Sequence, residues 1–248
     1  MTGNTTRRTE DATRPTRTSA RPTGDATRPT GTSARPTGAT TLLVIAKEPR
    51  PGRVKTRLTP PYTPEQAAEL AAAALADTLH ALLLAPARQR ILVLDGTPGP
   101  WLPPGFTVVP QAAGGLDERL AAAFAGCAGP ALLVGMDTPQ LSPELLDPAL
   151  REGAWREHDA WFGPAVDGGF WALGLASPDP GLLRGVPMSV PSTGAAQLGR
   201  LTAAGLRVGM LPRLRDVDTA EDARLVAAHA PDGRFAAALA GCEAGQAR

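Results

Sequence analysis

The sequence TLLVIAKEPRPGRVKTRL, residues 41–58, decides the fold class. Its first six residues are apolar or small, and a short apolar run bounded by Pro and Gly is typical of a buried strand rather than a helix. A loop with five cationic side chains in eleven residues follows: Lys47, Arg50, Arg53, Lys55 and Arg57. In open α/β sheets, ligands bind beyond the carboxyl ends of the strands. The stretch therefore predicts a polyphosphate site, with a solvated basic loop as the alternative.

The rest of the chain alternates between strand and helix patterns. Strands are predicted at residues 90–95, 106–109, 131–136, 160–163, 170–175 and 206–211. Helices are predicted at residues 63–83, 116–125, 195–204 and 220–229, with a further one from Ser142. Thr63 and Gln66 form the pattern of a capping box at the start of the first helix. This alternation predicts an α/β fold, a Rossmann-like and mostly parallel sheet with helices on both faces.

The first forty residues differ in composition from the rest of the chain. Residues 11–24 recur almost unchanged as residues 25–38, and this Thr, Pro, Arg and Gly tract offers little apolar surface to bury. We therefore predict that residues 1–40 form a disordered tail, with one folded domain over residues 41–241. Residues 242–248 are predicted to be a flexible C-terminus.

Charge and cysteine content exclude several classes of protein. Residues 1–38 contain seven Arg and three acidic residues, whereas the remainder contains 18 basic and 21 acidic residues. A slightly acidic domain does not fit a nucleic-acid binder. Cys127 and Cys242 are the only cysteines, which is typical of a reduced, cytoplasmic protein. No apolar run long enough for a membrane span, and no secretory signal, is expected. The oligomeric state is left open.

Carboxylates follow several of the predicted strands. Asp137 comes directly after the strand ALLVGM, Asp167 lies in the turn GPAVDGG, and Asp216 and Asp218 precede a helix. Magnesium is often held by one or two carboxylates together with substrate phosphates. These acids opposite a Lys/Arg loop therefore predict a site for a metal–diphosphate complex. As alternatives, Asp137 would be a turn residue and Asp218 an N-terminal helix cap.

Other well-known site patterns are missing. The chain has neither the spacing of a P-loop nor that of a dinucleotide-binding Gly motif, and no serine stands in a nucleophile elbow. The three histidines are not spaced as a metal pair. Phe170 and Trp171 are candidates for stacking on a ligand, but aromatic strand residues usually belong to the core.

Four segments, AKEPRPGRVKTRL, GMDTPQL, GPAVDGGFWALGL and DVDTAED, resemble in order and spacing the DUF2064 family, also called the rSAM/selenodomain-associated transferase 1 family. That family resembles nucleotide-diphospho-sugar transferases of the GT-A fold, and the resemblance covers about residues 41–230. Four positions depart from the family pattern: Thr138 replaces a Ser, Phe170 and Trp171 replace tyrosines, and Met188 replaces a Trp.

The resemblance implies a role for each matched residue. Lys47, Arg53, Lys55 and Arg57 would contact nucleotide phosphates, and Asp137 and Asp218 would hold Mg²⁺ or Mn²⁺. Asp137 and Asp167 would serve catalysis, with Gly168, Gly169 and Phe170 near a small-molecule acceptor. The implied activity is a metal-dependent glycosyltransferase that uses a nucleotide sugar. The alternatives are a guanylyltransferase-like nucleotidyltransferase, which joins an NTP to a phosphorylated small molecule, and a non-catalytic nucleotide-binding protein.

Overall fold

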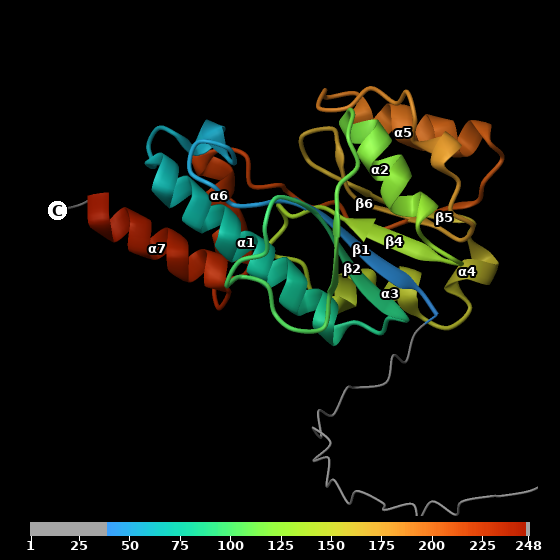
Figure 1. Ribbon diagram of the computed structural model, residues 1–248, viewed down its shortest axis with the longest axis horizontal. Coiled ribbons are helices and arrows are strands. Elements are labelled where there is room, and N and C mark those ends of the chain that lie inside the picture. Colours follow the sequence, from blue (N-terminus) through green and yellow to red (C-terminus); the bar gives the residue numbers. More distant parts are fainter. Residues whose placement is uncertain (1–38, 247–248) are drawn as a thin grey trace, which may run out of the picture. The chain divides into compact units, whose positions relative to one another are not determined.

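The computed structural model describes residues 39–246 of the chain. The predicted disordered tail therefore lies almost wholly outside the described residues. The described part is built on one sheet of seven strands in the order β3-β2-β1-β4-β6-β5-β7 (Figure 1). The strands are β1 (Thr41–Lys47), β2 (Gln89–Asp95), β3 (Thr107–Pro110), β4 (Ala131–Val134), β5 (Ala160–Pro164), β6 (Phe170–Leu175) and β7 (Val208–Met210).

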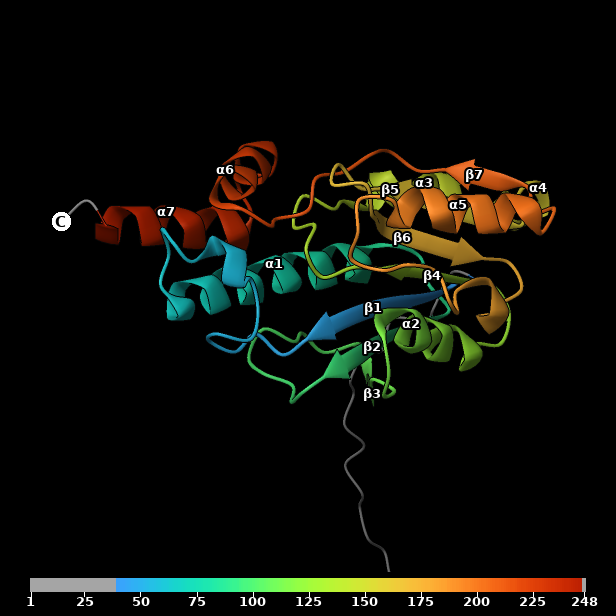
Figure 2. The same cartoon turned by 90° about the horizontal axis from the view of Figure 1, so that it is seen from above.

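Helices lie on both faces of this sheet, as the alternation of patterns predicted (Figures 1 and 2). The α-helices are α1 (Pro64–Leu84), α2 (Leu116–Ala125), α3 (Pro143–Leu150), α4 (Ala154–Glu157), α5 (Thr193–Ala203), α6 (Ala220–His229) and α7 (Arg234–Gln246). Two short 3₁₀ turns, η1 (Thr56–Leu58) and η2 (Pro180–Leu182), complete the elements.

Parallel pairing holds over most of the sheet, and β6 is the exception. β1 pairs in parallel with β2 and β4, β2 with β3, and β5 with β7. β6 runs antiparallel to both β4 and β5, because a tight turn from Ala165 to Gly169 returns the chain directly from β5. The sheet is therefore mostly parallel, as predicted, and its one reversal puts the Asp167 turn near the carboxyl end of β4.

Side chains that alternate along the strands divide the core into two layers. Leu42 and Val44 of β1 pack with Leu75 and Leu79 of α1 on one face. Leu43, between them, packs with α2 and α5 on the other face. Because successive residues of a strand point to opposite sides, β1 is buried on both faces, as its continuous apolar run indicates.

The start of α1 is as predicted. Thr63 accepts a hydrogen bond from the backbone N–H of Gln66, and the Gln66 side chain accepts one from the N–H of Thr63. This reciprocal pair is the predicted capping box and is confirmed. It fixes the point at which the chain leaves the cationic loop and enters the core.

The expectation that no segment is long and apolar enough to span a membrane was wrong for α1. This helix has 21 residues, and an 18-residue window within it, rich in Ala and Leu, has a mean hydropathy of 1.5 and passes that test of length and composition. However, 61% of the window is buried inside this fold, where α1 packs on the sheet and on α7. A buried core helix has this same composition, so the match is weak evidence for a membrane span.

The C-terminal segment differs from the prediction of a flexible end after residue 241. α7 continues to Gln246, and Phe235, Leu239 and Cys242 are all at most 5% exposed. These residues pack with α6 and with Leu58 and Tyr62, just after the cationic loop. Figure 2 shows α7 alongside the first turns of α1. α7 thus belongs to the folded domain, and it supports the segment that carries the cations. Cys127 and Cys242 are both free thiols.

Candidate active site

Two buried apolar side chains anchor the cationic loop. Val54 is 8% exposed and Leu58 is fully buried, whereas Lys47, Arg53 and Arg57 are exposed. The loop is therefore attached to the core at these two residues, while the three exposed cations face solvent. A loop held in this way differs from a solvated basic segment, the alternative that the sequence left open.

Lys55 occupies a special position within this loop. Its Nζ lies 2.8 Å from Oδ1 of Asp137 and 3.4 Å from Oδ1 of Asp218, and its side chain is only 8% exposed. Burial by itself would lower the pKa of Lys55, but attraction to Asp137 and then Asp218 raises it above its ordinary value. The backbone φ of Lys55 is +49°, in a left-handed region that costs a side-chain-bearing residue free energy. The fold thus holds a charged lysine between two carboxylates.

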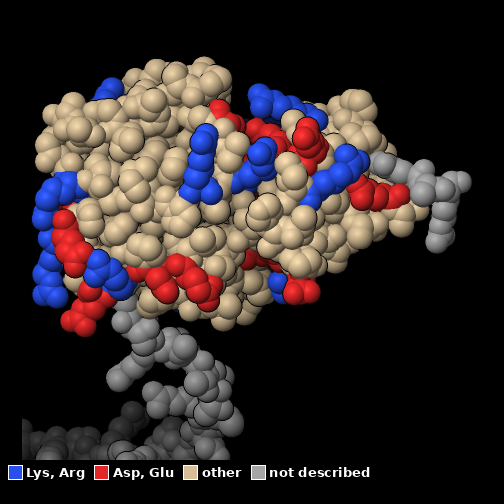
Figure 3. All heavy atoms as spheres, turned by 180° about the vertical axis from the view of Figure 1, so that it is seen from behind, with Lys and Arg blue, Asp and Glu red and all other residues tan. Residues whose placement is uncertain are grey.

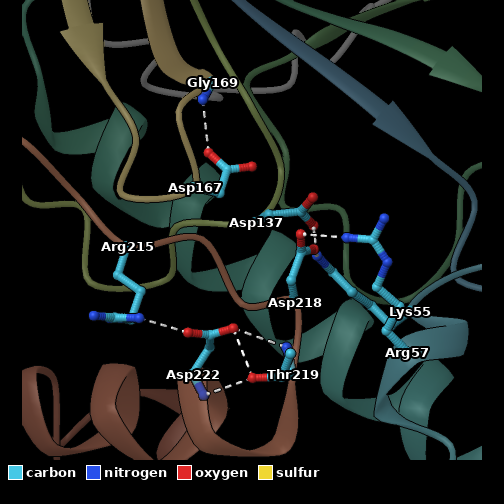
Figure 4. A network of polar contacts seen from close by, with 9 residues as sticks. All are labelled: Lys55, Arg57, Asp137, Asp167, Gly169, Arg215, Asp218, Thr219 and Asp222. Carbon is cyan, nitrogen blue, oxygen red and sulfur yellow. Dashed lines mark hydrogen bonds and ion pairs between the residues drawn. The ribbon is translucent and has the colours of Figure 1, made fainter. Parts of the chain in front are cut away.

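Asp137 reaches this position from the segment that follows β4. Its carbonyl oxygen accepts a hydrogen bond of 3.0 Å from the N–H of Val217, which joins it to the segment before α6. Figure 4 shows Asp137 and Asp218 pointing toward Lys55 from these two segments. The carboxylates therefore come together from sites about eighty residues apart in the sequence, with Lys55 between them.

Asp218 is not the cap of α6, which was the alternative reading of its position. Thr219 is the N-cap, and its side chain forms a capping box with Asp222. Asp222 also accepts a hydrogen bond of 2.7 Å from Arg215 (Figure 4). Because Thr219 and Asp222 satisfy the start of the helix, the carboxylate of Asp218 is free to pair with Lys55 and, at 3.3 Å, with Arg57.

Asp216 adds a third carboxylate next to the pair. Its Oδ1 is buried and has no hydrogen-bond partner within residues 39–246. Burial, followed by repulsion from Asp137 and Asp167, raises the pKa of Asp216 to about 7, although Lys55 acts in the opposite direction. The site therefore has an unsatisfied acceptor and an excess of negative charge, both of which favour an added cation or proton.

Asp167 lies in the turn between β5 and β6. Its Oδ1 accepts a hydrogen bond of 2.8 Å from the N–H of Gly169, and the residue is exposed (Figure 4). Gly168 has φ +91°, and a Cβ there would collide with the carbonyl oxygen of Pro191. Gly168 thus permits close packing of this turn against the segment before α5, and its neighbours Asp167 and Gly169 face the cleft.

These groups border one cleft of about 770 Å³ across the carboxyl ends of β1 and β4. Among the residues to which the family resemblance gives a role, Gly168 is the only one that does not line it. The predicted residues on its walls are Lys47, Arg53, Lys55, Arg57, Asp137, Asp167, Gly169, Phe170 and Asp218. Arg50 instead pairs with Glu48 at 2.7 Å and borders a smaller cavity of about 150 Å³.

Among the polar residues of the cleft that the sequence prediction missed are Gln111 and Arg119. The Gln111 side chain donates to the carbonyl oxygens of Ala46 and Val93, at 2.7 and 3.2 Å, so it ties together the ends of β1 and β2. Arg119 donates to Oε1 of Gln111 and pairs with Asp95. The sequence feature that could have pointed to this part of the cleft is the pair Gly114-Gly115 ahead of α2, because glycine turns allow the backbone to approach a ligand closely.

The charges around the cleft are mixed in sign. On the face shown in Figure 3, basic and acidic side chains lie next to one another near the upper middle rather than in one large basic surface.

The carboxylates of the cleft form an incomplete donor set for a divalent metal. Within residues 39–246, no group of three or more His, Cys, Asp or Glu side chains is arranged as a complete metal site. Mg²⁺, however, is commonly bound through one or two carboxylates plus substrate phosphates. Asp137 and Asp218 can supply such a pair, and the orphaned buried oxygen of Asp216 lies near them. The residues therefore fit a metal that binds together with a phosphate ligand.

A known protein family matches the part of the chain that contains much of this cleft. The family profile described as "Uncharacterized protein conserved in bacteria (DUF2064)" matches residues 67–190, half of the chain. The chain belongs to the DUF2064 family. The matched range contains Asp137, Asp167 and Phe170, while the cationic loop and Asp218 lie outside it. No curated protein matches the chain.

Two solved structures show the fold of this DUF2064 member. A proposed nucleotide-diphospho-sugar transferase from Desulfovibrio desulfuricans G20 is 26% identical, with a TM-score of 0.73, over 83% of this chain and 95% of the other. CMP:2-keto-3-deoxy-manno-octonic acid synthetase complexed with CTP is 12% identical, with a TM-score of 0.51, over 78% of this chain and 99% of the other. Because the synthetase is only 12% identical, its similarity shows a shared fold and nothing about activity. The predicted GT-A-like fold is confirmed.

Proposed function

We propose that this protein is a metal-dependent glycosyltransferase whose donor is a nucleotide sugar. One observation carries the proposal: the cations of the loop after β1 face the carboxylates of Asp137 and Asp218 across the same cleft. A diphosphate needs positive charge from the protein, and a metal bound to that diphosphate needs carboxylates. The two requirements are met within one cavity.

Lys47 and Arg53 are the residues best placed to take the diphosphate. Both are exposed, both line the cleft, and neither forms an ion pair within the described part of the chain. Lys55 and Arg57, by contrast, already pair with Asp137 or Asp218. We infer that Lys47 and Arg53 bind the phosphates first, while Lys55 and Arg57 keep the carboxylates in position.

Asp137 and Asp218 would hold Mg²⁺ or Mn²⁺. When bound, such an ion neutralises charge that develops on a diphosphate leaving group. The cationic side chains of the loop contribute to the same effect, because preorganised positive groups stabilise charge where it appears in the transition state. Lys55, nearly excluded from water, is the side chain from which this effect would be greatest.

Asp167 would orient the acceptor or take its proton. Its Oδ1 is engaged by the N–H of Gly169, so its orientation is fixed, while Oδ2 has no partner among the described residues. A general base must lie within hydrogen-bond reach of the proton that it removes. An exposed carboxylate held in one orientation on the wall of the cleft meets that requirement for an acceptor hydroxyl.

The similarity to the Desulfovibrio protein supports the choice of a sugar nucleotide as donor. That protein is described as a nucleotide-diphospho-sugar transferase and covers nearly the same length of chain. The synthetase with bound CTP supports a nucleotide ligand only in so far as both chains share a fold.

Ligand-induced stabilisation of the full-length chain tests the proposal. The purified protein is heated with a panel of NTPs, NDPs and nucleotide sugars, each with and without Mg²⁺ or Mn²⁺. A ligand at about 100 times its Kd adds about 2.7 kcal/mol to the free energy of unfolding, which raises the melting temperature. Asp137→Ala should abolish a metal-dependent shift. Asp147→Ala, which changes an exposed acid of α3 away from the cleft, should not.

The released product then distinguishes the possible reactions. Release of NDP from the stabilising nucleotide sugar supports glycosyl transfer. Stabilisation only by an NTP, with release of pyrophosphate, would replace the proposal with nucleotidyl transfer. Binding without turnover in the presence of a broad acceptor mixture would favour a nucleotide-binding protein, and no binding at all would contradict the proposed site.

A further inference from the structure

The cleft has an apolar wall opposite its charged half. We use this name for Leu116, Phe170, Met188 and Val190, which all line the cleft. Leu116 is 41% exposed and Val190 is 42% exposed, so both present apolar surface to the cavity. Large apolar side chains with this exposure on the wall of a cavity are typical of a ligand contact.

The exposure of Val190 does not come from a loose backbone. The N–H of Val190 donates to Oγ1 of Thr193 at 3.2 Å, and its carbonyl oxygen accepts from the N–H of Thr193 at 3.0 Å. The neighbouring Ser189 adopts a left-handed backbone with φ +60°, which is uncommon for a residue with a side chain. Ser189 and Lys55 are the two non-glycine residues with positive φ among residues 39–246, and both line the cleft.

The apolar wall has no cation of its own. Four of the five basic residues that line the cleft belong to the loop after β1, and these are Lys47, Arg53, Lys55 and Arg57. The fifth, Arg119, is turned toward Gln111 and Asp95. The turn next to the wall instead contributes the carboxylate of Asp167. A negatively charged group bound against this wall would therefore meet repulsion and no counter-ion.

The wall is physically joined to the turn that carries Asp167. The N–H of Gly194 donates to the carbonyl oxygen of Gly168 at 2.8 Å, and Gly168 packs against Pro191. Phe170 follows Gly169 directly at the start of β6. Asp167, Phe170 and Val190 therefore line the cleft on connected segments, and a molecule bound there with its hydroxyl at Asp167 lies near the apolar wall.

We propose that the acceptor is an uncharged hydroxyl compound with an apolar body, such as an alkyl or aryl alcohol or glycoside, and not a phosphorylated small molecule. This inference rests on the proposed glycosyl transfer. In that reaction the acceptor oxygen forms a bond to the anomeric carbon of the donor. The bond from that carbon to the diphosphate oxygen breaks, and the diphosphate leaves with the electron pair. The proton of the hydroxyl passes to Asp167.

Three probes with the same sugar test this inference by calorimetric titration of the full-length protein. They are n-octyl β-D-glucoside below its micelle concentration, methyl β-D-glucoside and glucose 6-phosphate. Each buried methylene strengthens binding by roughly fourfold. We therefore expect the octyl compound to bind at least ~10-fold more tightly than the methyl compound, and glucose 6-phosphate to show no binding that depends on Val190.

Two matched variants locate the binding. Val190→Asp places a charge on the wall and should weaken binding of the octyl compound at least ~10-fold, because a desolvated carboxylate opposes an apolar ligand. Val166→Asp is the control, since Val166 has nearly the same exposure, 38%, but does not line the cleft. It should leave binding within about twofold of the unchanged protein.

The outcomes separate this inference from the proposed function. If nucleotides stabilise the protein but the octyl compound binds no better than the methyl compound, the glycosyl-transfer proposal stands and the apolar acceptor is wrong. Tight, Val190-independent binding of glucose 6-phosphate would also overturn it. If a nucleotide competes with the octyl compound and Val190→Asp weakens nucleotide binding, the wall contacts the donor instead, which again overturns the inference. If no nucleotide binds at all, the proposed function itself fails.

Discussion

The ammonium nitrogen of Lys55 lies 2.8 Å from a carboxylate oxygen of Asp137, with the lysine side chain 8% exposed and the aspartate side chain 36% exposed. The same ammonium lies 3.4 Å from Asp218. A positive charge held between two partly exposed carboxylates keeps them from repelling each other. The lysine therefore has a structural role in the free protein in addition to any role toward phosphate.

Replacing Lys55 should destabilise the protein. We expect Lys55→Met to lower the free energy of unfolding by about 2 kcal/mol, less than for a fully buried pair because water reaches both carboxylates. Urea denaturation measures the change. Arg57→Met is the matched control, since Arg57 pairs with Asp218 at 3.3 Å but its side chain is 76% exposed. It should cost about 0.5 kcal/mol or less.

A double-mutant cycle checks the cause of this loss. Adding Asp137→Asn to Lys55→Met removes one of the two carboxylates that would otherwise repel each other. The double variant should therefore be more stable than Lys55→Met alone, because interacting residues give non-additive effects. If the two losses simply add, the pairing of Lys55 with Asp137 contributes nothing to stability.

Metal binding should depend on the nucleotide. No group of three ligand side chains is arranged for a metal within residues 39–246, and Lys55 already compensates Asp137 and Asp218. We expect Mg²⁺ or Mn²⁺ alone to raise the melting temperature little, and a metal with a nucleotide to raise it more than the sum of the separate effects. Strong stabilisation by the metal alone, abolished in Asp218→Asn, would contradict this expectation.

The sequence predicted the strands because each one is an apolar run bounded by Gly or Pro. It missed α4, whose four residues are too few to show helical periodicity. It also missed α7, where Ala and Gly dilute the apolar spacing of Phe235, Leu239 and Cys242. Burial of α7 comes from packing against α1 and α6, and such tertiary contacts are not visible in a local pattern.

The candidate site could be predicted only in part. Residues at strand ends meet at one edge of a parallel sheet, so Asp137 and the cationic loop were expected to face each other. The pairing of Lys55 with Asp137 depends instead on a left-handed backbone at a lysine, which no sequence motif indicates. Gln111 joins the cleft because the irregular loop after β3 brings its side chain to the carbonyl oxygen of Ala46. Hydrophobic periodicity gives no information about the path of such a loop.

Gly168 should tolerate no side chain. Its φ of +91° is strained for any other residue, and a Cβ would collide with the carbonyl oxygen of Pro191. We expect Gly168→Ala to cost roughly 3 kcal/mol, the sum of the left-handed strain and the steric conflict. Gly185→Ala is the control, since Gly185 has φ +75° with no atom within 4 Å of an added Cβ. It should cost only about 1 kcal/mol. Equal losses in urea denaturation would show that the contact with Pro191 is unimportant.

Asp159 should make stability depend on pH in the acid range. The side chain of Arg207 and then its backbone N–H donate to Asp159, at 2.9 to 3.0 Å, and lower the pKa of Asp159 from 3.8 to about 2. Because the pKa is lower in the folded state, the unfolded chain binds the proton more readily. The contribution to stability is therefore complete above about pH 4 and is lost as the pH falls through about 2.

Urea denaturation of Asp159→Asn across this range tests the expectation. The variant should be less stable than the unchanged protein near pH 6, and the difference should narrow steadily as the pH falls below about 4. Glu152→Gln is the control, because Glu152 is exposed and forms no ion pair or side-chain hydrogen bond within the described residues. Its difference from the unchanged protein should stay small throughout. If the stability difference for Asp159→Asn does not change with pH, the variant loses shape complementarity rather than charge, and the ion pair between Asp159 and Arg207 does not account for any acid sensitivity.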